Sequence, residues 1–131
     1  MKMYIKSVVV DDQAKARTFY TETLGFQIKH DIPMGEFSWL TLVSPEEPDG
    51  VELALEPGAH EATNTFRAAL MADGIPFTAF SVGDLDAEYE RLTAAGVEFT
   101  NPPMTAGGAK MAVFNDTCGN LIQLIELLDQ A

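Results

Sequence analysis

Val10-Asp11-Asp12 opens a helical stretch that ends at Gly25, and Val82-Gly83-Asp84 opens a second one that ends at Gly96. The valine and the glycine are fifteen residues apart in the first copy and fourteen apart in the second. In both copies a short strand-like run follows the glycine directly. This repetition predicts two similar modules with a shared cleft.

The first module has the expected order β-α-β-β-β. Asp12 is a suitable N-cap, because its carboxylate can accept from the free amides of the first helical turn. Gly25 fits the left-handed position just past the helix end. Strand-like runs separated by turn signals predict strands over residues 4–10, 27–32, 37–43 and 51–56.

The second module repeats this order. Asp84 caps a helix whose apolar residues Leu85, Tyr89 and Leu92 lie on one face. Pro102-Pro103 and Gly107-Gly108 are expected to break the chain between the second and third strands. The strands expected here are residues 77–82, 98–101, 110–115 and 121–127.

The chain is predicted to be one α+β domain, with module one at residues 1–56, a connector at 57–74 and module two at 75–131. Apolar residues spaced by four between Ala62 and Leu70 predict a short helix in the connector. That helix either links the modules or covers part of a cleft.

Composition excludes several classes of protein. A hydrophobic content of 47% with 21% charged residues is typical of a globular chain. The net charge of −12 argues against a nucleic-acid partner, since phosphate binding needs a basic surface. No apolar run has the length that a bilayer requires, so no membrane partner is expected. Cys118 is the single cysteine, which fits a reducing cytosol and predicts a cytoplasmic location.

The ordered set of motifs resembles the vicinal oxygen chelate superfamily. The motifs are V-x-D before each helix, Phe19-Tyr20 ahead of Leu24-Gly25-Phe26, and D-x-x-G-N at residues 116–120. This superfamily includes glyoxalase I, extradiol dioxygenases, fosfomycin-resistance enzymes and bleomycin-binding resistance proteins. The resemblance covers almost the whole chain. It implies two βαβββ modules that form a curved, barrel-like mixed sheet with the helices outside, commonly completed by a second subunit as a homodimer.

The resemblance also implies four metal-ligand positions on strands. The first, usually His, lies seven residues before Asp12 and is Ile5 here. The second, a carboxylate or His, matches Glu52. The third, the His that opens the second module, is Phe77, and the fourth, a Glu in the last strand, is Gln123. A divalent site needs several converging oxygen or imidazole donors, so the standard site is predicted to be lost, with no metal and no cofactor.

Other candidate donors do not restore that site. His30 and His60 have no chelating spacing, and each is interpreted as a surface residue. Glu56 shares a face with Glu52 and is interpreted as a carboxylate at a wet strand end, the alternative being a shared cation. Cys118 is expected in a turn and not as a nucleophile.

Strand alternation predicts the inner face of the sheet. Either these side chains line a pocket for a small molecule, or they fill a barrel-like core. Trp39 can stack on a planar or cationic ligand or serve as a core anchor. The residues expected to contact a ligand are Ile5, Ser7, Trp39, Thr41, Glu52, Phe77, Ala79 and Gln123, and Ala54 and Ile125 complete the face.

Glu52 is the one charged ligand position that remains, and its role is open. In an apolar surround it is a candidate general base. A hydrogen bond from Gln123 would instead make it an orienting acceptor. Arg67, in the connector, is a candidate counter-charge.

Two classes of function follow. One is a binding protein resembling the bleomycin-resistance branch, a homodimer that takes an apolar or cationic small molecule in its cleft. The other is a glyoxalase- or dioxygenase-type enzyme that uses a displaced metal or Glu52 as its base. A third possibility is an interaction domain whose core is filled.

Overall fold

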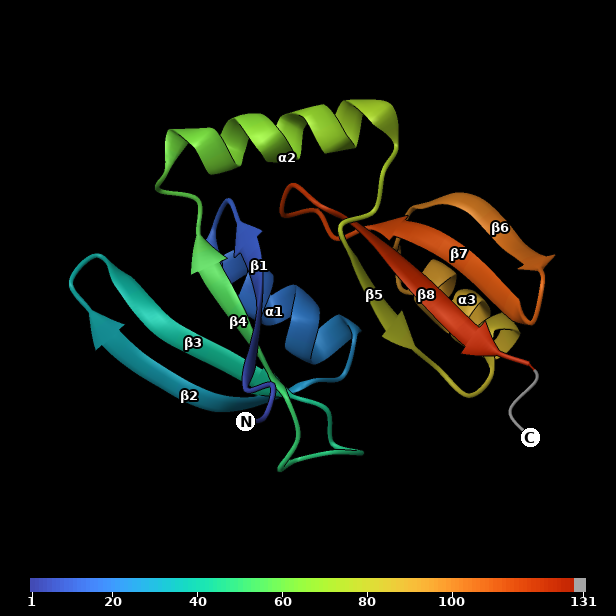
Figure 1. Cartoon of the computed structure of the whole chain (residues 1–131), viewed down its shortest axis with the longest axis horizontal. Helices are drawn as coiled ribbons and strands as arrows, with labels where there is room; N and C mark the ends of the chain where they lie inside the picture. The colour runs from blue at the N-terminus through green and yellow to red at the C-terminus, as the bar shows by residue number, and fades with distance from the viewer. Residues whose placement is uncertain (129–131) are drawn as a thin grey trace. The chain divides into compact units, whose positions relative to one another are not determined.

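The computed structural model describes residues 1–128. The chain divides into two compact units, Met1–Thr65 and Phe66–Ala131, each with one four-stranded mixed sheet (Figure 1). The α+β class and the βαβββ order of both modules are confirmed. Each sheet is curved and open, and neither closes into a barrel by itself.

The first unit contains sheet A and its covering helix. The chain runs through β1 (Ile5–Val10), α1 (Gln13–Thr18), the π-helical turn η1 (Phe19–Thr23), β2 (Gln27–Met34), β3 (Phe37–Val43) and β4 (Glu52–Pro57). The strand order is β1-β4-β3-β2, with β1 parallel to β4 and the other pairs antiparallel. β2 extends beyond the predicted end at residue 32, because it stays paired with β3 up to the turn at Gly35.

One face of sheet A is sealed by α1 and η1. Asp12 caps α1 as predicted, accepting from the Lys15 amide at 3.1 Å. The helical stretch ends at Gly25, whose φ of +95° is the left-handed conformation expected there. The side chains buried in this layer are Ala16 and Tyr20 from the helix and Val8, Val10, Leu40, Leu42, Leu53 and Leu55 from the strands.

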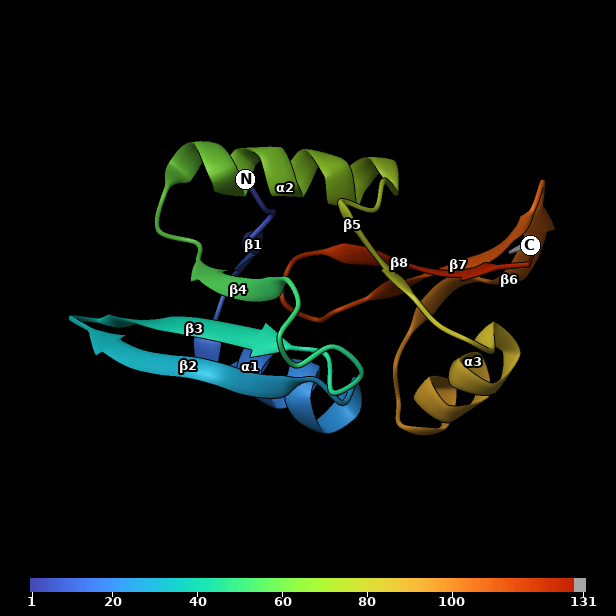
Figure 2. The ribbon, with the colours of Figure 1, turned by 60° about the horizontal axis from the view of Figure 1, so that its bottom comes forward.

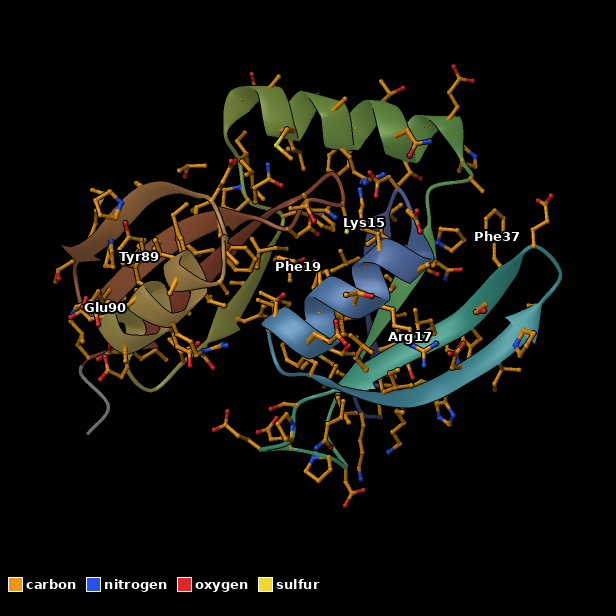
Figure 3. All side chains as sticks on the ribbon, turned by 180° about the vertical axis from the view of Figure 1, so that it is seen from behind. Lys15, Arg17, Phe19, Phe37, Tyr89 and Glu90 are labelled. Atoms are coloured by element: carbon orange, nitrogen blue, oxygen red, sulfur yellow. The ribbon has the colours of Figure 1, made fainter. Side chains whose placement is uncertain are left out.

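Gln13 fixes the start of α1 to the sheet. Its Nε2 donates to the carbonyl oxygens of Ser38 at 2.9 Å and Leu55 at 2.8 Å, and its Oε1 accepts from the Ser38 amide at 3.0 Å. Figure 3 shows α1 against the sheet, with Arg17 beside the β2–β3 hairpin. Arg17 forms an ion pair with Asp31 of β2 at 2.7 Å. The position of α1 is therefore set by polar contacts as well as by apolar burial.

The second unit repeats this plan. The predicted connector helix is α2 (Glu61–Asp73), followed by β5 (Thr78–Ser81), α3 (Leu85–Ala94), β6 (Phe99–Ala106), β7 (Ala109–Asn115) and β8 (Leu121–Leu127). These strands form sheet B in the order β5-β8-β7-β6, with β5 parallel to β8. α3 lies on one side of sheet B (Figure 2) and is capped by Asp84, as predicted.

The layer between α3 and sheet B is apolar, with polar contacts at its margin. Leu85 and Leu92 of α3 are buried, as are Phe114 and Ile122 of the strands. At the margin, Lys110 donates to Asp86 Oδ2 of α3 at 2.8 Å, and this hydrogen bond raises the pKa of Lys110 above its ordinary value. None of the helices within residues 1–128 has both the length and the apolar character that crossing a bilayer requires.

The expected break at Pro102-Pro103 is wrong. β6 continues through both prolines to Ala106 and pairs with β7, with a register shift between Asn101 and Met104. A proline has no amide to donate, so it is tolerated in an edge strand or at a bulge. β6 is an edge strand of sheet B and its irregular register falls at the prolines, so both conditions are met.

The turn before β8 is held by a buried carboxylate. Asp116 Oδ1 accepts from the amides of Cys118 at 2.7 Å and Asn120 at 3.0 Å, and its Oδ2 accepts from Asn120 Nδ2 at 2.9 Å. Arg67 of α2 donates through Nη2 to the Cys118 carbonyl at 2.5 Å. Gly119 sits beneath this guanidinium with φ of +98°. The D-x-x-G-N motif thus joins α2 to the start of β8.

We expect Gly119→Ala to lower the free energy of unfolding by about 1–2 kcal/mol, because the backbone is left-handed there and the new Cβ would collide with the Arg67 guanidinium. Chemical denaturation measures the change. The matched control is Gly96→Ala, where φ is +92° and a Cβ meets nothing within 4 Å. Equal losses in the two variants would show that the Arg67 contact contributes nothing.

Candidate functional site

The predicted site residues of the first module share the face of sheet A opposite α1. Ile5 is the register partner of Glu52, and Ser7 is the partner of Ala54. Thr41 of β3 is also paired with Ala54. Cross-strand partners point to the same face of a sheet. Sheet A therefore brings these residues together as the strand alternation predicted.

Glu52 is buried on this face and hydrogen-bonded. Only 5% of the surface of Glu52 is exposed. Thr41 is fully buried, and its Oγ1 donates a hydrogen bond to Glu52 Oε1 at 2.8 Å. A buried carboxylate needs such donors, because it has lost the hydrogen bonds of water. Within the first unit, the donor that the structure assigns to Glu52 is thus Thr41 of the neighbouring strand.

His30, interpreted from the sequence as a surface residue, has a side chain that is 39% exposed. Its Nε2 nevertheless lies 3.8 Å from Glu52 Oε1, a proximity that the sequence interpretation did not include. The register shift between Ile28 and His30 makes His30 the partner of Thr41. Because a bulge resets the alternation of side chains, counting along the strand could not have placed it.

Trp39 lies on the same face as Thr41, two residues earlier in β3, and is half-buried. Its register partner on β2 is Ile32, which is exposed. The face thus combines a buried polar centre at Glu52 and Thr41 with an aromatic and aliphatic margin towards the edge strand β2. This composition is typical of a surface that contacts a small molecule.

The predicted site residues of the second module lie on sheet B. Ala79 of β5 is the register partner of Gln123 of β8, and both belong to the face opposite α3. Gln123 Nε2 lies 3.4 Å from Met111 Sδ, and Ile125 shares this face. Phe77 precedes β5 by one residue and packs edge-to-face on Phe66 at a centroid distance of 5.7 Å.

The donor set does not fit the metal that the resemblance implies. Glu52 sits beside Ile5, whose side chain offers no ligand atom. Phe77 offers none either, and Gln123 offers a neutral amide. Within either unit of residues 1–128, no three His, Cys, Asp or Glu side chains gather as a metal-binding group.

Three other residues that the sequence offered as possible site residues make contacts near their own positions in the fold. His60 Nδ1 accepts from the Ala62 amide at 3.1 Å at the start of α2. Arg67, the proposed counter-charge, is engaged at the turn before β8. Cys118 lies in that turn, as predicted, and is fully buried.

A groove of about 710 Å³ lies on the other side of sheet A. It runs between α1 and the β2–β3 hairpin and includes Gln13, Arg17, Asp31 and Phe37; Figure 3 shows Arg17 and Phe37 there. The groove belongs to the helix-covered face, whereas Glu52 belongs to the opposite one. It is thus distinct from the predicted site.

The chain belongs to the Glyoxalase/Bleomycin resistance protein/Dioxygenase superfamily, whose family description matches residues 4–124. The predicted membership is therefore confirmed. The uncharacterized protein YurT of Bacillus subtilis (strain 168) is 49% identical over 126 residues, which cover 96% of this chain and 99% of YurT.

Two solved structures are similar over nearly their whole length. UcmS2 superimposes with a TM-score of 0.81 at 37% identity, covering 95% of this chain and 97% of UcmS2. TnmS3, described as an antibiotic binding protein from Streptomyces sp. CB03234, gives a TM-score of 0.74 at 27% identity, with coverage of 97% and 96%. The fold is thus shared with a protein that binds an antibiotic.

We expect Thr41→Val to lower the free energy of unfolding by about 1–3 kcal/mol, because it removes the hydroxyl that donates to the buried Glu52 carboxylate. Denaturant titration measures the loss. In a Glu52→Leu background the same substitution should cost much less, since no carboxylate then needs the donor. The same cost in both backgrounds would mean that the Thr41–Glu52 hydrogen bond does not stabilise the fold.

Proposed function

We propose that this protein binds a small molecule, apolar or cationic, as a homodimer, and that it does so without the metal of the superfamily's enzymes. The proposed ligand-contacting residues are Ile5, Ser7, Trp39, Thr41 and Glu52 on sheet A and Phe77, Ala79 and Gln123 on sheet B. The single cysteine supports a cytoplasmic location.

The observation that carries the proposal is the state of Glu52. It is the one charged side chain at the four positions where the superfamily holds its metal, and it is buried and bonded to Thr41. A carboxylate held in this way is a fixed acceptor that can anchor a ligand. The neighbouring Ile5 supplies apolar surface in place of a metal ligand.

The similarity to TnmS3 supports a binding role. That protein is described as an antibiotic binding protein, and the similarity to it runs over almost the whole of both chains. The net charge of −12 favours a cationic ligand, and Trp39 favours a planar one.

A second candidate function is an enzyme of the glyoxalase or dioxygenase type. The proximity of His30 Nε2 to Glu52 Oε1 favours it, because an imidazole beside a carboxylate is a common acid–base pair. Such an enzyme would use Glu52 as its base or hold a displaced metal near this pair.

Metal analysis of protein purified without chelator separates the two candidates. For the binding protein we expect far less than one equivalent of Zn, Ni, Mn or Fe per chain, because the donor set lacks converging ligands. One equivalent that is lost in Glu52→Ala would contradict the proposal. A turnover that Glu52→Gln abolishes, with the fold intact by circular dichroism, would favour the enzyme.

We expect a dimer in sedimentation velocity experiments at micromolar concentration. The edge strand β2 exposes Ile28, Ile32 and Met34, and an apolar strand edge is commonly covered by a partner. A monomer across this concentration range would contradict the dimer and leave the ligand proposal to be judged by binding alone.

A further inference from the structure

We propose that His30 and Glu52 together bind a hydroxyl group of the ligand, so that His30 is a specificity-determining residue. The inference rests on the proposed binding function and narrows it, since it selects an apolar molecule that carries a hydroxyl. The hydroxyl would lie between the imidazole and the carboxylate, on the face of sheet A opposite α1.

The distance between the two side chains carries this inference. His30 Nε2 and Glu52 Oε1 are 3.8 Å apart, which is too long for a hydrogen bond between them. Two atoms at this separation can both lie within about 2.8–3.0 Å of one third atom. One oxygen atom can therefore bridge them, and a ligand hydroxyl can replace a water molecule there without loss of hydrogen bonds.

The carboxylate has room for this oxygen. An ionised carboxylate offers about four acceptor sites. Thr41 occupies one of them, on Oε1. Within residues 1–65, the part of the chain that forms the first unit, no other side-chain donor is hydrogen-bonded to Glu52. The side chain is held in place, yet it can still accept a hydrogen bond.

His30 is held on the correct face and remains accessible. Its pairing with Thr41 after the register shift directs the imidazole to the side of Glu52. The His30 side chain is 39% exposed, whereas that of Glu52 is 6% exposed. The imidazole is thus the more accessible of the two groups, and the carboxylate lies behind it.

Nε2 is the nitrogen of His30 that lies near Glu52. In the neutral tautomer that carries its hydrogen on Nε2, that hydrogen is on the side of the carboxylate. In that tautomer His30 donates and Glu52 accepts. A hydroxyl satisfies both, because it accepts one hydrogen bond and donates another.

This arrangement discriminates among otherwise similar ligands. A methyl ether accepts from His30 but has no hydrogen for Glu52. An ammonium group donates to Glu52 but cannot accept from His30. Trp39, about 7 Å along β3 from Thr41 on the same face, offers its ring to the apolar body of the ligand.

The test uses 2-naphthol, 2-methoxynaphthalene and 2-naphthylmethylammonium with the full chain. Binding is followed by the indole N–H signal of Trp39 in a proton–nitrogen NMR spectrum, which is unambiguous because Trp39 is the single tryptophan. We expect 2-naphthol to bind about threefold to tenfold more tightly than 2-methoxynaphthalene, because of these two only 2-naphthol donates a hydrogen bond to Glu52.

Variants of His30 complete the test. His30→Phe keeps a planar ring without a donor and should weaken 2-naphthol and 2-methoxynaphthalene alike by about threefold to tenfold, because both accept from His30, while 2-naphthylmethylammonium binds as before. His30→Gln keeps a donor and should retain part of the affinity for 2-naphthol and 2-methoxynaphthalene. His60→Asn is the matched control, since it changes the other histidine and keeps an acceptor for the Ala62 amide.

The outcomes separate this inference from the proposed function. If 2-naphthol and 2-methoxynaphthalene bind equally well, or if His30→Phe leaves both affinities unchanged, the hydroxyl site is wrong while the binding function stands. If none of the probes shifts the Trp39 signal, both the hydroxyl site and the proposed binding function fail. A preference for 2-naphthol over 2-methoxynaphthalene, with a loss of affinity for both in His30→Phe and no loss in His60→Asn, supports the inference.

Discussion

The packing of each sheet against its own helix is the constraint on which the rest of the structure depends. In sheet A the buried layer beneath α1 is apolar, and Gln13 locks the helix to β3 and β4 through hydrogen bonds to Ser38 and Leu55. Side chains alternate between the two faces along a strand. When the apolar side chains are buried beneath the helix, the side chains between them therefore lie on the opposite face. Glu52 and Thr41 belong to that opposite face because Leu53 and Leu42 belong to the core.

Glu52 occupies a position that the resemblance assigns to a metal ligand, and its register partner is Ile5, whose side chain offers no ligand atom. A carboxylate beside Ile5 cannot share a metal with it, so its burial requires another source of hydrogen bonds. Thr41 supplies one directly, and His30 brings a second polar group within reach. Glu52 is thus a fixed acceptor in a surface of mixed polarity.

The helix caps and the faces of the strands could be predicted from the sequence, because both depend on residues close together in the chain. Asp12 and Asp84 cap their helices as predicted, and strand alternation placed Ile5, Ser7 and Glu52 on one face. The rules failed where pairing overrides local preference. Pro102 and Pro103 lie inside β6 because an edge strand does not need their amides. The proximity of His30 to Glu52 was not predicted, because the bulge in β2 shifts the alternation of side chains by one residue.

The sequence by itself determined the superfamily and the repeated βαβββ order, since these depend on residue identity and spacing along the chain. Only the tertiary structure decided what surrounds Glu52. Thr41 and His30 stand eleven and twenty-two positions before it (52 − 41 and 52 − 30). The register of β2, β3 and β4 brings the three together, and register is set by pairing between strands, which no local sequence pattern encodes.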